Sequence, residues 1–322
     1  MKKISLCIPC YNEEKNIPLV YRALTKIMEQ MKNYDYEMIF EDNASTDRSI
    51  EILRDMAKED SKVKVILNTR NFGPSRSGKN CCFNATGDVI ISVAADLQNP
   101  VSMIPVFIKY WEEGYKVVMG QKNSSKEGKI KYALRKLYYK IISVFSEVPQ
   151  ISNITGFGAI DSEVYRKVYE MREYEMSIRH LLAELGYEIK LVSYEQEVRK
   201  HGKSSYNLWR SLDFSINSLI HTSYAPIRII TLFGLGGELT TVLGGIGYLI
   251  YKIVTKSYGR ISIIPIIIMI CLIGFIQIFF LGIIGEYISN ILKKVTVREI
   301  VTEKERINFG DEPCVKDEKF TK

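Results

Sequence analysis

The sequence predicts an α/β fold with a mostly parallel sheet, followed by two apolar helices. Short apolar runs alternate with amphipathic segments over residues 1–120, as in βαβ units. The apolar run Val89–Val93 is rich in β-branched residues and is bounded by polar turns, which indicates a strand covered on both faces. Two long apolar stretches, 229–251 and 261–285, lie toward the C-terminus, and only the first contains a charged residue, Glu238.

The expected elements alternate at the spacing of right-handed βαβ units, which build a parallel sheet. The expected strands are 4–9, 36–40, 63–67, 89–93, 116–120, a strand beginning near residue 155, and 189–194. The expected helices are 13–31, 47–58, 73–85, 101–113, 128–146, two beginning at residues 162 and 175, and 207–221. The first half of the chain is therefore typical of an α/β domain that binds a nucleotide, with its ligand crevice at the carboxyl ends of the strands.

Both apolar stretches are long enough to cross a bilayer, whose core requires about 20 residues of helix. We expect transmembrane helices over about 227–252 and 261–288, forming a hairpin within the region 223–292. The charged tail 293–322 follows this hairpin, and it is expected either to be disordered or to pair with a neighbouring subunit of a homo-oligomer.

The N-terminal sequence reaches charged residues before any apolar run long enough for a signal peptide. The domain formed by residues 1–222 is therefore expected in the cytoplasm, at the face of the cytoplasmic membrane. A two-helix hairpin returns the tail to the same side. The basic residues support this orientation only in part, because Lys252, Lys256 and Arg260 fall in the loop between the two apolar stretches.

The formal net charge is +7, from 44 Lys and Arg against 37 Asp and Glu. A basic chain is compatible with nucleic acid, but anionic lipid head groups are the nearer partner of a membrane-anchored protein, so no nucleic-acid partner is expected. The six cysteines are expected to be mostly thiols. Cys7 and Cys10 have the redox spacing C-x-x-C, but neither is clearly placed at a helix N-terminus that would lower its pKa, so a redox role is disfavoured.

Polar clusters follow three of the expected strands, at residues 9–13, 42–47 and 96–98. Parallel strands place their carboxyl ends at one edge of a sheet, so the three clusters are expected to lie together. Each cluster alone is explained by helix capping, for which Asn, Asp, Ser and Thr are favoured. Their coincidence favours a ligand site, in which Asp96 binds a metal or a phosphate; the alternative for Asp96 is a capping acid in a surface turn.

The segment Gly73–Asn80 nearly matches the phosphate loop G-x-x-x-x-G-K-[ST]. Asn80 lacks the hydroxyl that binds magnesium in such a loop, and Pro74 lacks one of the backbone N–H groups that hold phosphate. An ATPase is therefore disfavoured.

Two basic segments are expected to face anions. Residues 128–146 are expected to form a basic amphipathic helix, which we interpret as lying in the lipid interface rather than as a solvated face over a core. Residues 199–206 form a basic loop ahead of the amphipathic helix 207–221. This loop is interpreted either as a phosphate-binding loop or as a patch on lipid head groups.

Six motifs occur in order along nearly the whole chain. They are Pro9, Tyr11, Asn12 and Glu13; Asp42 to Asp47; Arg70 to Gly73 through Gly87 and Asp88 to the run Asp96 to Pro100; Thr155 to Gly158; Arg199, Gly202 and Ser204; and Gly285 to Ile288. Together they resemble the membrane-bound, inverting family 2 glycosyltransferases that charge polyprenyl phosphates, such as dolichyl-phosphate mannose synthases and undecaprenyl-phosphate sugar transferases.

The resemblance implies a GT-A fold that binds a UDP- or GDP-linked sugar and acts on a polyprenyl phosphate. It assigns Asp96 and Gln98 to a divalent metal, for which hard oxygen ligands favour Mg²⁺ or Mn²⁺. Asp96 and Arg199 are the implied catalytic residues. The implied nucleotide-sugar-binding residues are Pro9, Tyr11, Asn12, Glu13, Asp42 and Asn43. The implied residues for the acceptor phosphate are Lys122, Arg135, Arg199, Lys203 and Ser204.

The chain departs from the family pattern at two places. Ala94 stands where the family usually has the first Asp of Asp-x-Asp, so one carboxylate is missing near the metal. No acidic residue stands near Thr155–Phe157, where many relatives carry one that is proposed as a base. A lipid phosphate, with a second pKa of about 6, is already largely dianionic at neutral pH and needs cations more than a base.

The leading hypothesis is therefore an inverting, metal-dependent transfer of a sugar to a polyprenyl phosphate. A processive polysaccharide synthase is disfavoured, because only two apolar spans are expected and the Arg-Trp acceptor motif of that group is absent. The alternative, motivated by Ala94, is a catalytically degraded relative that acts as a membrane scaffold or regulator.

Overall fold

The computed structural model describes residues 1–122, 154–174, 177–196, 264–295, 299–310 and 314–316, together with single positions between 236 and 254. The chain forms two compact units, one made of residues 1–140, 148–207 and 298–322 and the other of 141–147 and 208–297. The first unit contains an eight-stranded sheet with the strand order β7-β5-β6-β4-β1-β2-β3-β8.

The sheet is mixed but mostly parallel, as predicted. Strands β4, β1, β2 and β3 are parallel neighbours, and β5 and β7 form a second parallel pair. Two strands are antiparallel to their neighbours. Strand β6, which was predicted as a strand but not as antiparallel, separates β4 from β5. Strand β8, which was not predicted, pairs with β3 at the edge. The strands are β1 (Lys3–Cys10), β2 (Asp35–Asp42), β3 (Val63–Asn68), β4 (Val89–Ser92), β5 (Val117–Lys122), β6 (Ile154–Asp161), β7 (Ile189–Tyr194) and β8 (Glu303–Ile307).

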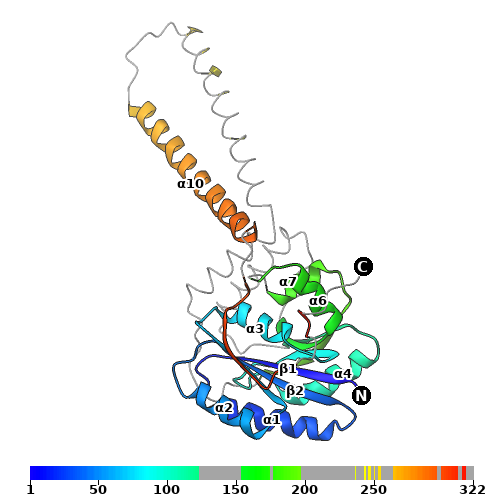
Figure 1. Cartoon of the computed structure of the whole chain (residues 1–322). Coiled ribbons are helices and arrows are strands. Elements are labelled where there is room, and N and C mark those ends of the chain that lie inside the picture. The colour runs from blue at the N-terminus through cyan, green and yellow to red at the C-terminus, as the bar shows by residue number, and fades with distance from the viewer. Residues whose placement is uncertain are drawn as a thin grey trace. The chain divides into compact units, whose positions relative to one another are not determined.

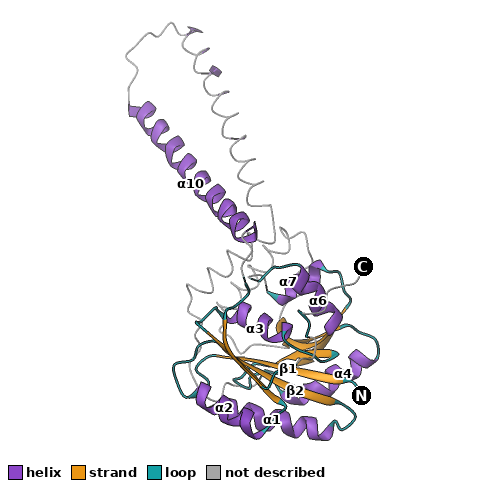
Figure 2. Cartoon of the chain, viewed as in Figure 1, coloured by secondary structure: helices purple, strands orange, loops and turns teal. Residues whose placement is uncertain are grey.

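Helices cover both faces of the sheet (Figures 1 and 2). Helices α1 (Ile17–Gln30), α2 (Ser49–Glu59) and α4 (Ile104–Glu112) bury their apolar residues with one set of strand side chains. Helices α3 (Pro74–Phe83), α6 (Ser162–Glu170) and α7 (Ile178–Glu184) pack against the alternate set. Because successive strand residues point to opposite faces, β1 contributes Leu6 to the first core and Cys7 to the second.

The expected strands and helices that fall within residues 1–122, 154–174 and 177–196 are confirmed in order, with shifted ends. The first helix begins at Ile17 rather than at residue 13, because Glu13 to Asn16 form a turn in which the Glu13 carbonyl accepts from Asn16 N at 2.9 Å. Pro18 lies in the first helical turn, where its missing N–H costs no hydrogen bond. The segment expected as one helix over 101–113 is a 3₁₀ turn at Val101–Met103 followed by α4.

The second unit contains α10 (Ile264–Val295), which includes residues 264–285 of the second apolar stretch. In the part of the chain that the structure describes, no helix has the length and apolar character that a membrane crossing requires. The basic helix expected over 128–146 and the helix expected over 207–221 lie outside the described residues.

The C-terminal tail is part of the sheet at residues 303–307. Strand β8 pairs antiparallel with β3, with Ile307 opposite Val65 and Arg306 opposite Ile66. Neither expectation for the tail, disorder or pairing with a neighbouring subunit, describes this segment. Local sequence did not reveal the strand, because four of its five residues are charged, and such a segment forms a strand only beside an unpaired sheet edge.

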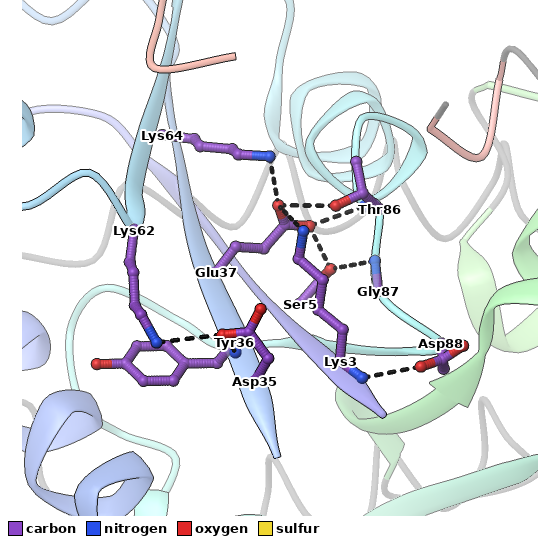
Figure 3. Close-up of polar contacts among 10 residues, drawn as sticks. All are labelled: Lys3, Ser5, Asp35, Tyr36, Glu37, Lys62, Lys64, Thr86, Gly87 and Asp88. Carbon is purple, nitrogen blue, oxygen red and sulfur yellow. Dashed lines mark hydrogen bonds and ion pairs between the residues drawn. The ribbon is translucent and has the colours of Figure 1, made fainter. Parts of the chain in front are cut away.

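A buried carboxylate, Glu37, joins the strands at the edge opposite to their carboxyl ends (Figure 3). It accepts hydrogen bonds from the Ser5 hydroxyl and from the backbone N–H of Thr86, and its other oxygen lies 2.6 Å from Lys64 Nζ. Burial alone would raise the pKa of Glu37, but these donors hold it below its ordinary value. Gly87 completes the junction, because a Cβ there would lie 2.6 Å from Ser5 Oγ. The cluster is structural and lies away from the predicted site.

Candidate functional site

The three predicted polar clusters meet at one edge of the sheet. They follow β1, β2 and β4, which are adjacent parallel strands in the order β4-β1-β2. Strands β5 and β7 run in the same direction as β4, because β6 is antiparallel to both β4 and β5. Their carboxyl ends and the start of β6 therefore lie at this edge as well. We call it the site edge.

Asn12 links the loops that follow β1 and β2. Its Oδ1 accepts from Thr46 N at 2.8 Å, and its own N–H donates to Ser45 Oγ at 2.8 Å. Asn12 has a φ of 56°, a left-handed conformation that Asn tolerates better than most residues. Its side chain thus holds the two loops together, so the structure gives this predicted nucleotide-binding residue a scaffolding contact.

Asp42 ends β2 at the site edge and is fully buried. Its Oδ1 accepts from Ser45 N at 2.8 Å, whereas Oδ2 has no hydrogen-bond partner among the described residues. Burial raises the pKa of Asp42, and the neighbouring carboxylate of Asp47 adds to the increase. A buried carboxylate oxygen without a donor is costly, so this atom is suited to a ligand that brings an N–H or O–H group.

Asn43, the next residue, holds the loop between β3 and α3. Its Nδ2 donates to Asn71 Oδ1 at 3.0 Å, and its Oδ1 accepts from Phe72 N at 2.9 Å. Gly73 follows with a φ of 88°, which favours glycine. The side chain of Asn43 is therefore occupied by the fold, and it positions the loop Arg70–Gly73 at the site edge.

The other residues predicted after β1 differ in exposure. Tyr11 is 42% exposed, so its ring is accessible at the site edge. Pro9 packs toward α3, where a Cβ at Gly78 would lie 3.8 Å from Pro9 Cγ. Glu13 is half-buried and accepts a hydrogen bond at 2.5 Å from Asn16 Nδ2.

The turn after β4 contains the predicted metal ligands. Asp96 Oδ1 accepts from Gln98 N at 3.2 Å, and Leu97 between them has a φ of 55°. This left-handed residue folds the turn back on itself, so Asp96 and Gln98 are neighbours in space as well as in sequence. Ala94, before the turn, contributes its carbonyl oxygen to Leu97 N at 3.4 Å.

Two residues that sequence reasoning missed, one at the end of β7 and one just after it, hold this turn. Gln196 Nε2 donates to Gln98 Oε1 at 3.2 Å, and the Tyr194 hydroxyl donates to Asn99 Oδ1 at 3.2 Å. The Tyr194 ring packs edge-on against Phe157 at 5.7 Å between centroids. The available signal was that polar residues follow the predicted strand 189–194, as they follow the three strands that were recognised.

The donor set at the turn fits a divalent metal only in part. Asp96 supplies a carboxylate and Gln98 an amide oxygen, which are ligands of the type that Mg²⁺ and Mn²⁺ prefer. Among the described residues, no group of three His, Cys, Asp or Glu side chains is placed to hold a metal. A metal at this turn would therefore need further oxygens from a substrate or from water.

Of the residues predicted for the acceptor phosphate, Lys122 ends β5 at the site edge, opposite Tyr194 in the parallel pairing. The remaining four lie outside the described residues: Arg135, Arg199, Lys203 and Ser204.

The segment that resembles a phosphate loop is the first part of α3. Lys79 is 5% exposed, and its Nζ donates to the carbonyl oxygens of Glu173 and Tyr174 at 3.0 and 2.9 Å. The ammonium group thus holds the chain after α6, which agrees with the prediction that this is not an ATPase loop. The redox interpretation of Cys7 and Cys10 is also disfavoured, because burial raises the pKa of both thiols.

The family model "Glycosyl transferase family 2" matches residues 5–169, just over half of the 322 residues. The chain belongs to this family. It is therefore a glycosyltransferase, and its mostly parallel mixed sheet is a GT-A-like α/β fold.

Relatives that match along most of their length support this assignment. "Putative glycosyltransferase CsbB" of Bacillus subtilis is 30% identical over 89% of this chain and 87% of its own length. "Bactoprenol glucosyl transferase" of Shigella phage SfX is 28% identical over 90% of this chain and 94% of its own. The solved mannosyl-3-phosphoglycerate synthase of Rubrobacter xylanophilus is 13% identical, with a TM-score of 0.47 over 68% of this chain and 73% of its own. The strand order, rather than this last likeness, defines the fold.

Proposed function

We propose that this glycosyltransferase transfers a sugar from a nucleotide-sugar to a polyprenyl phosphate, with inversion at the anomeric carbon. The observation that carries the proposal is the convergence of the loops after β1, β2 and β4 at the site edge. The names of relatives suggest the acceptor, because that of Shigella phage SfX is named a bactoprenol glucosyl transferase and that of Escherichia coli a prophage bactoprenol glucosyl transferase homolog.

The nucleotide is proposed to bind at the end of β2. The unpartnered Asp42 Oδ2 accepts a hydrogen bond from the base or the ribose, and the exposed ring of Tyr11 offers a face for stacking. Pro9 and Glu13 line the same loops. Asn12 and Asn43 contribute indirectly, because their side chains hold the loops in place.

The diphosphate is proposed to lie at the turn after β4, where Asp96 and Gln98 would hold Mg²⁺ or Mn²⁺ with oxygens of the diphosphate completing the ligand set. A bound metal at this place neutralises the charge of the departing nucleoside diphosphate. Tyr194 and Gln196 keep the turn in position through Asn99 and Gln98. Because Ala94 supplies no carboxylate, the charge of the site depends on Asp96.

In the proposed reaction a phosphate oxygen of the lipid attacks the anomeric carbon, and the bond from that carbon to the nucleoside diphosphate breaks on the opposite face. No side-chain base is required, because the lipid phosphate is largely ionised at neutral pH. Cations orient this nucleophile. The proposed cations are Lys122, Arg135, Arg199 and Lys203, with Ser204 as a further hydrogen-bond donor, and Arg199 is the planar partner for phosphate oxygens.

The lipid acceptor places the reaction at a membrane. We propose that the apolar stretches 227–252 and 261–288 are transmembrane helices within a region 223–292, and that residues 128–146 lie in the lipid interface. Residues 1–222 then form the cytoplasmic catalytic domain of an integral protein of the cytoplasmic membrane. Part of the 293–322 tail belongs to the same compact unit as the sheet.

Incubation of membranes containing the full chain with radiolabelled UDP- and GDP-sugars, Mg²⁺ or Mn²⁺ and undecaprenyl phosphate tests the proposal. The expected result is label in the organic phase, dependent on metal and lost in Asp96→Ala. The absence of a lipid product from every donor, with nucleotide binding retained, would favour the alternative of a scaffold or regulator. Metal-dependent activity that persists in Asp96→Ala would remove Asp96 from the metal site.

A further inference from the structure

The residues that follow α10 in the chain contact the sheet domain near the predicted donor site. We call residues 299–307, which include β8, the strap. The strap lies along β3, and the chain beyond it reaches the end of α3, where Val315 N donates to Ala85 O at 3.1 Å and Lys316 N to Phe83 O at 3.2 Å. The C-terminal segment therefore contacts β3 and both ends of the α3 region.

The strap holds the flanks of the loop Arg70–Gly73. On one side Thr69 N donates to Thr302 O at 3.0 Å, and on the other Arg76 Nη2 donates to Glu299 O at 2.8 Å. Asn43 holds the middle of the same loop through Asn71 and Phe72. The loop is thus fixed between the end of β2 and the strap.

A second connection runs through buried side chains. Asn80 Nδ2 donates to Glu41 Oε2 at 3.0 Å and to Glu303 Oε1 at 3.0 Å, so one amide bridges a carboxyl group of β2 and one of the strap. Asn68 Nδ2 donates to the other oxygen of Glu41 at 2.9 Å. Glu41 is fully buried and Asn80 is 2% exposed, so solvent does not replace these contacts. On the solvent-exposed side of this network, Arg306 Nη2 donates to Glu303 Oε1 at 3.0 Å.

Glu41 immediately precedes Asp42, and the two side chains point to opposite faces of β2. The contacts of Glu41 with α3 and β3 therefore fix the backbone that carries Asp42. Few other described contacts restrain the Asp42 side chain, whose Oδ1 is held by Ser45 and whose Oδ2 has no partner among the described residues.

We propose that Glu303 and Asn80 are positioning residues of the donor site: through Glu41 they fix Asp42, and with the strap they hold the loop Arg70–Gly73. The inference rests on the proposed function for the identity of the ligand, a nucleoside diphosphate. It assigns the C-terminal strap a role in donor binding although the strap lies more than 250 residues from Asp42 in the sequence.

The test compares full-length Glu303→Ala and Glu303→Gln with Glu305→Ala, in detergent or nanodiscs. Glu305 is a matched control, because it lies on the same strand but pairs with Arg54 at the surface. Hydrogen exchange is measured for peptides covering residues 41–47 and 69–84. It reports on the order of the loop after β2 and of the loop Arg70–Gly73 when no lipid phosphate is present. Binding of UDP and of GDP is measured by calorimetry, and the donor KM and kcat are measured separately.

Glu303→Ala is expected to accelerate exchange in both peptides and to weaken nucleoside diphosphate binding by about three- to tenfold, with a matching rise in donor KM and little change in kcat. Glu303→Gln retains a hydrogen-bond acceptor for Asn80. It is therefore expected to keep hydrogen exchange and nucleotide affinity close to those of the wild type. Glu305→Ala is expected to resemble the wild type in both measurements.

Equal nucleotide affinity in Glu303→Ala and wild type, or equal losses in Glu303→Ala and Glu305→Ala, would overturn the inference. These outcomes differ from a failure of the proposed function, in which the wild type itself forms no lipid product or binds neither UDP nor GDP. Lost affinity in Glu303→Ala that Glu303→Gln does not restore, together with a lower melting temperature in both variants, would show a general structural role and would also overturn it.

Discussion

The side-chain amide of Gln196 donates a hydrogen bond to Oε1 of Gln98 over 3.2 Å, across 98 residues of sequence. This contact ties the end of β7 to the turn that contains Asp96. Tyr194 makes a parallel connection from its hydroxyl to Asn99. The turn predicted to hold the metal is therefore stabilised by a strand that the sequence motifs did not include, and its geometry depends on residues outside those motifs.

Replacement of Gln196 by Ala is expected to raise the Mg²⁺ or Mn²⁺ concentration for half-maximal activity about fivefold. The reason is the loss of one hydrogen bond, which contributes about 1 kcal/mol, from a proposed metal ligand. Titration of sugar transfer with metal at saturating donor measures the change. Glu195→Ala, at the exposed neighbouring position, is the control. An unchanged metal requirement in Gln196→Ala would mean that the contact does not orient Gln98 for a metal.

Ala94→Asp is expected to tighten metal binding about tenfold, because a second carboxylate near Asp96 adds a hard ligand and a negative charge. Paramagnetic titration with Mn²⁺ measures the affinity directly, and activity against metal concentration provides a second readout. Ala94→Asn is the matched control, since it adds similar volume without the charge. Equal Mn²⁺ affinities for Ala94→Asp and Ala94→Asn would show that position 94 does not face the metal.

Glu41→Gln is expected to remove a pH dependence of folding stability. Burial raises the pKa of Glu41 to about 8 from an ordinary 4.5, against the opposing effect of the Asn68 and Asn80 amides. The folded protein therefore retains a proton that the unfolded chain loses, and this group's contribution to stability falls as the pH rises from 4.5 to 8. Between pH 6 and 8.5 the contribution of Glu41 to the free energy of unfolding falls by about 3 kcal/mol.

Melting temperatures of wild type and Glu41→Gln at pH 6 and 8.5 measure this effect. The wild type is expected to lose more stability than the variant over this interval, so the difference between them narrows or reverses at pH 8.5. Asp55→Asn, at a surface position of α2, is the control for charge removal. Parallel pH profiles for wild type and Glu41→Gln would contradict the assigned titration.

Lys79→Met is expected to destabilise the sheet domain by about 2–3 kcal/mol, because it removes a buried ammonium group from the Glu173 and Tyr174 carbonyls. Thermal unfolding measures the loss, and limited proteolysis is expected to cut faster between α6 and α7. Lys26→Met on the exposed face of α1 is the control. Unaltered stability in Lys79→Met, with a loss of nucleotide binding instead, would indicate that Lys79 binds phosphate.

Much of the fold could be predicted from the sequence because it depends on local patterns. The strand 189–194 was predicted with the bounds observed for β7, and β1 to β6 were located to within a few residues, whereas β8 was not predicted. The meeting of the loops after β1, β2 and β4 could also be predicted, since parallel strands necessarily bring their carboxyl ends to one edge. The first three of the six family motifs include those loops.

Tertiary structure decided which residues hold these loops. The side chains of Asn12 and Asn43, two residues predicted to bind the nucleotide-sugar, join neighbouring loops. Gln196 and Glu303 were not predicted, although each contacts a residue at or beside the proposed site.

The sequence by itself thus determined the α/β architecture, the membership in glycosyl transferase family 2 and the edge of the sheet at which three predicted polar clusters lie. Only the tertiary structure decided that β6 and β8 are antiparallel and that the C-terminal strap reaches Glu41 through Asn80. The physical reason is that periodicity and turn chemistry act over a few residues, whereas a hydrogen bond between distant segments depends on which strand edges and buried polar groups remain to be satisfied once the chain has folded.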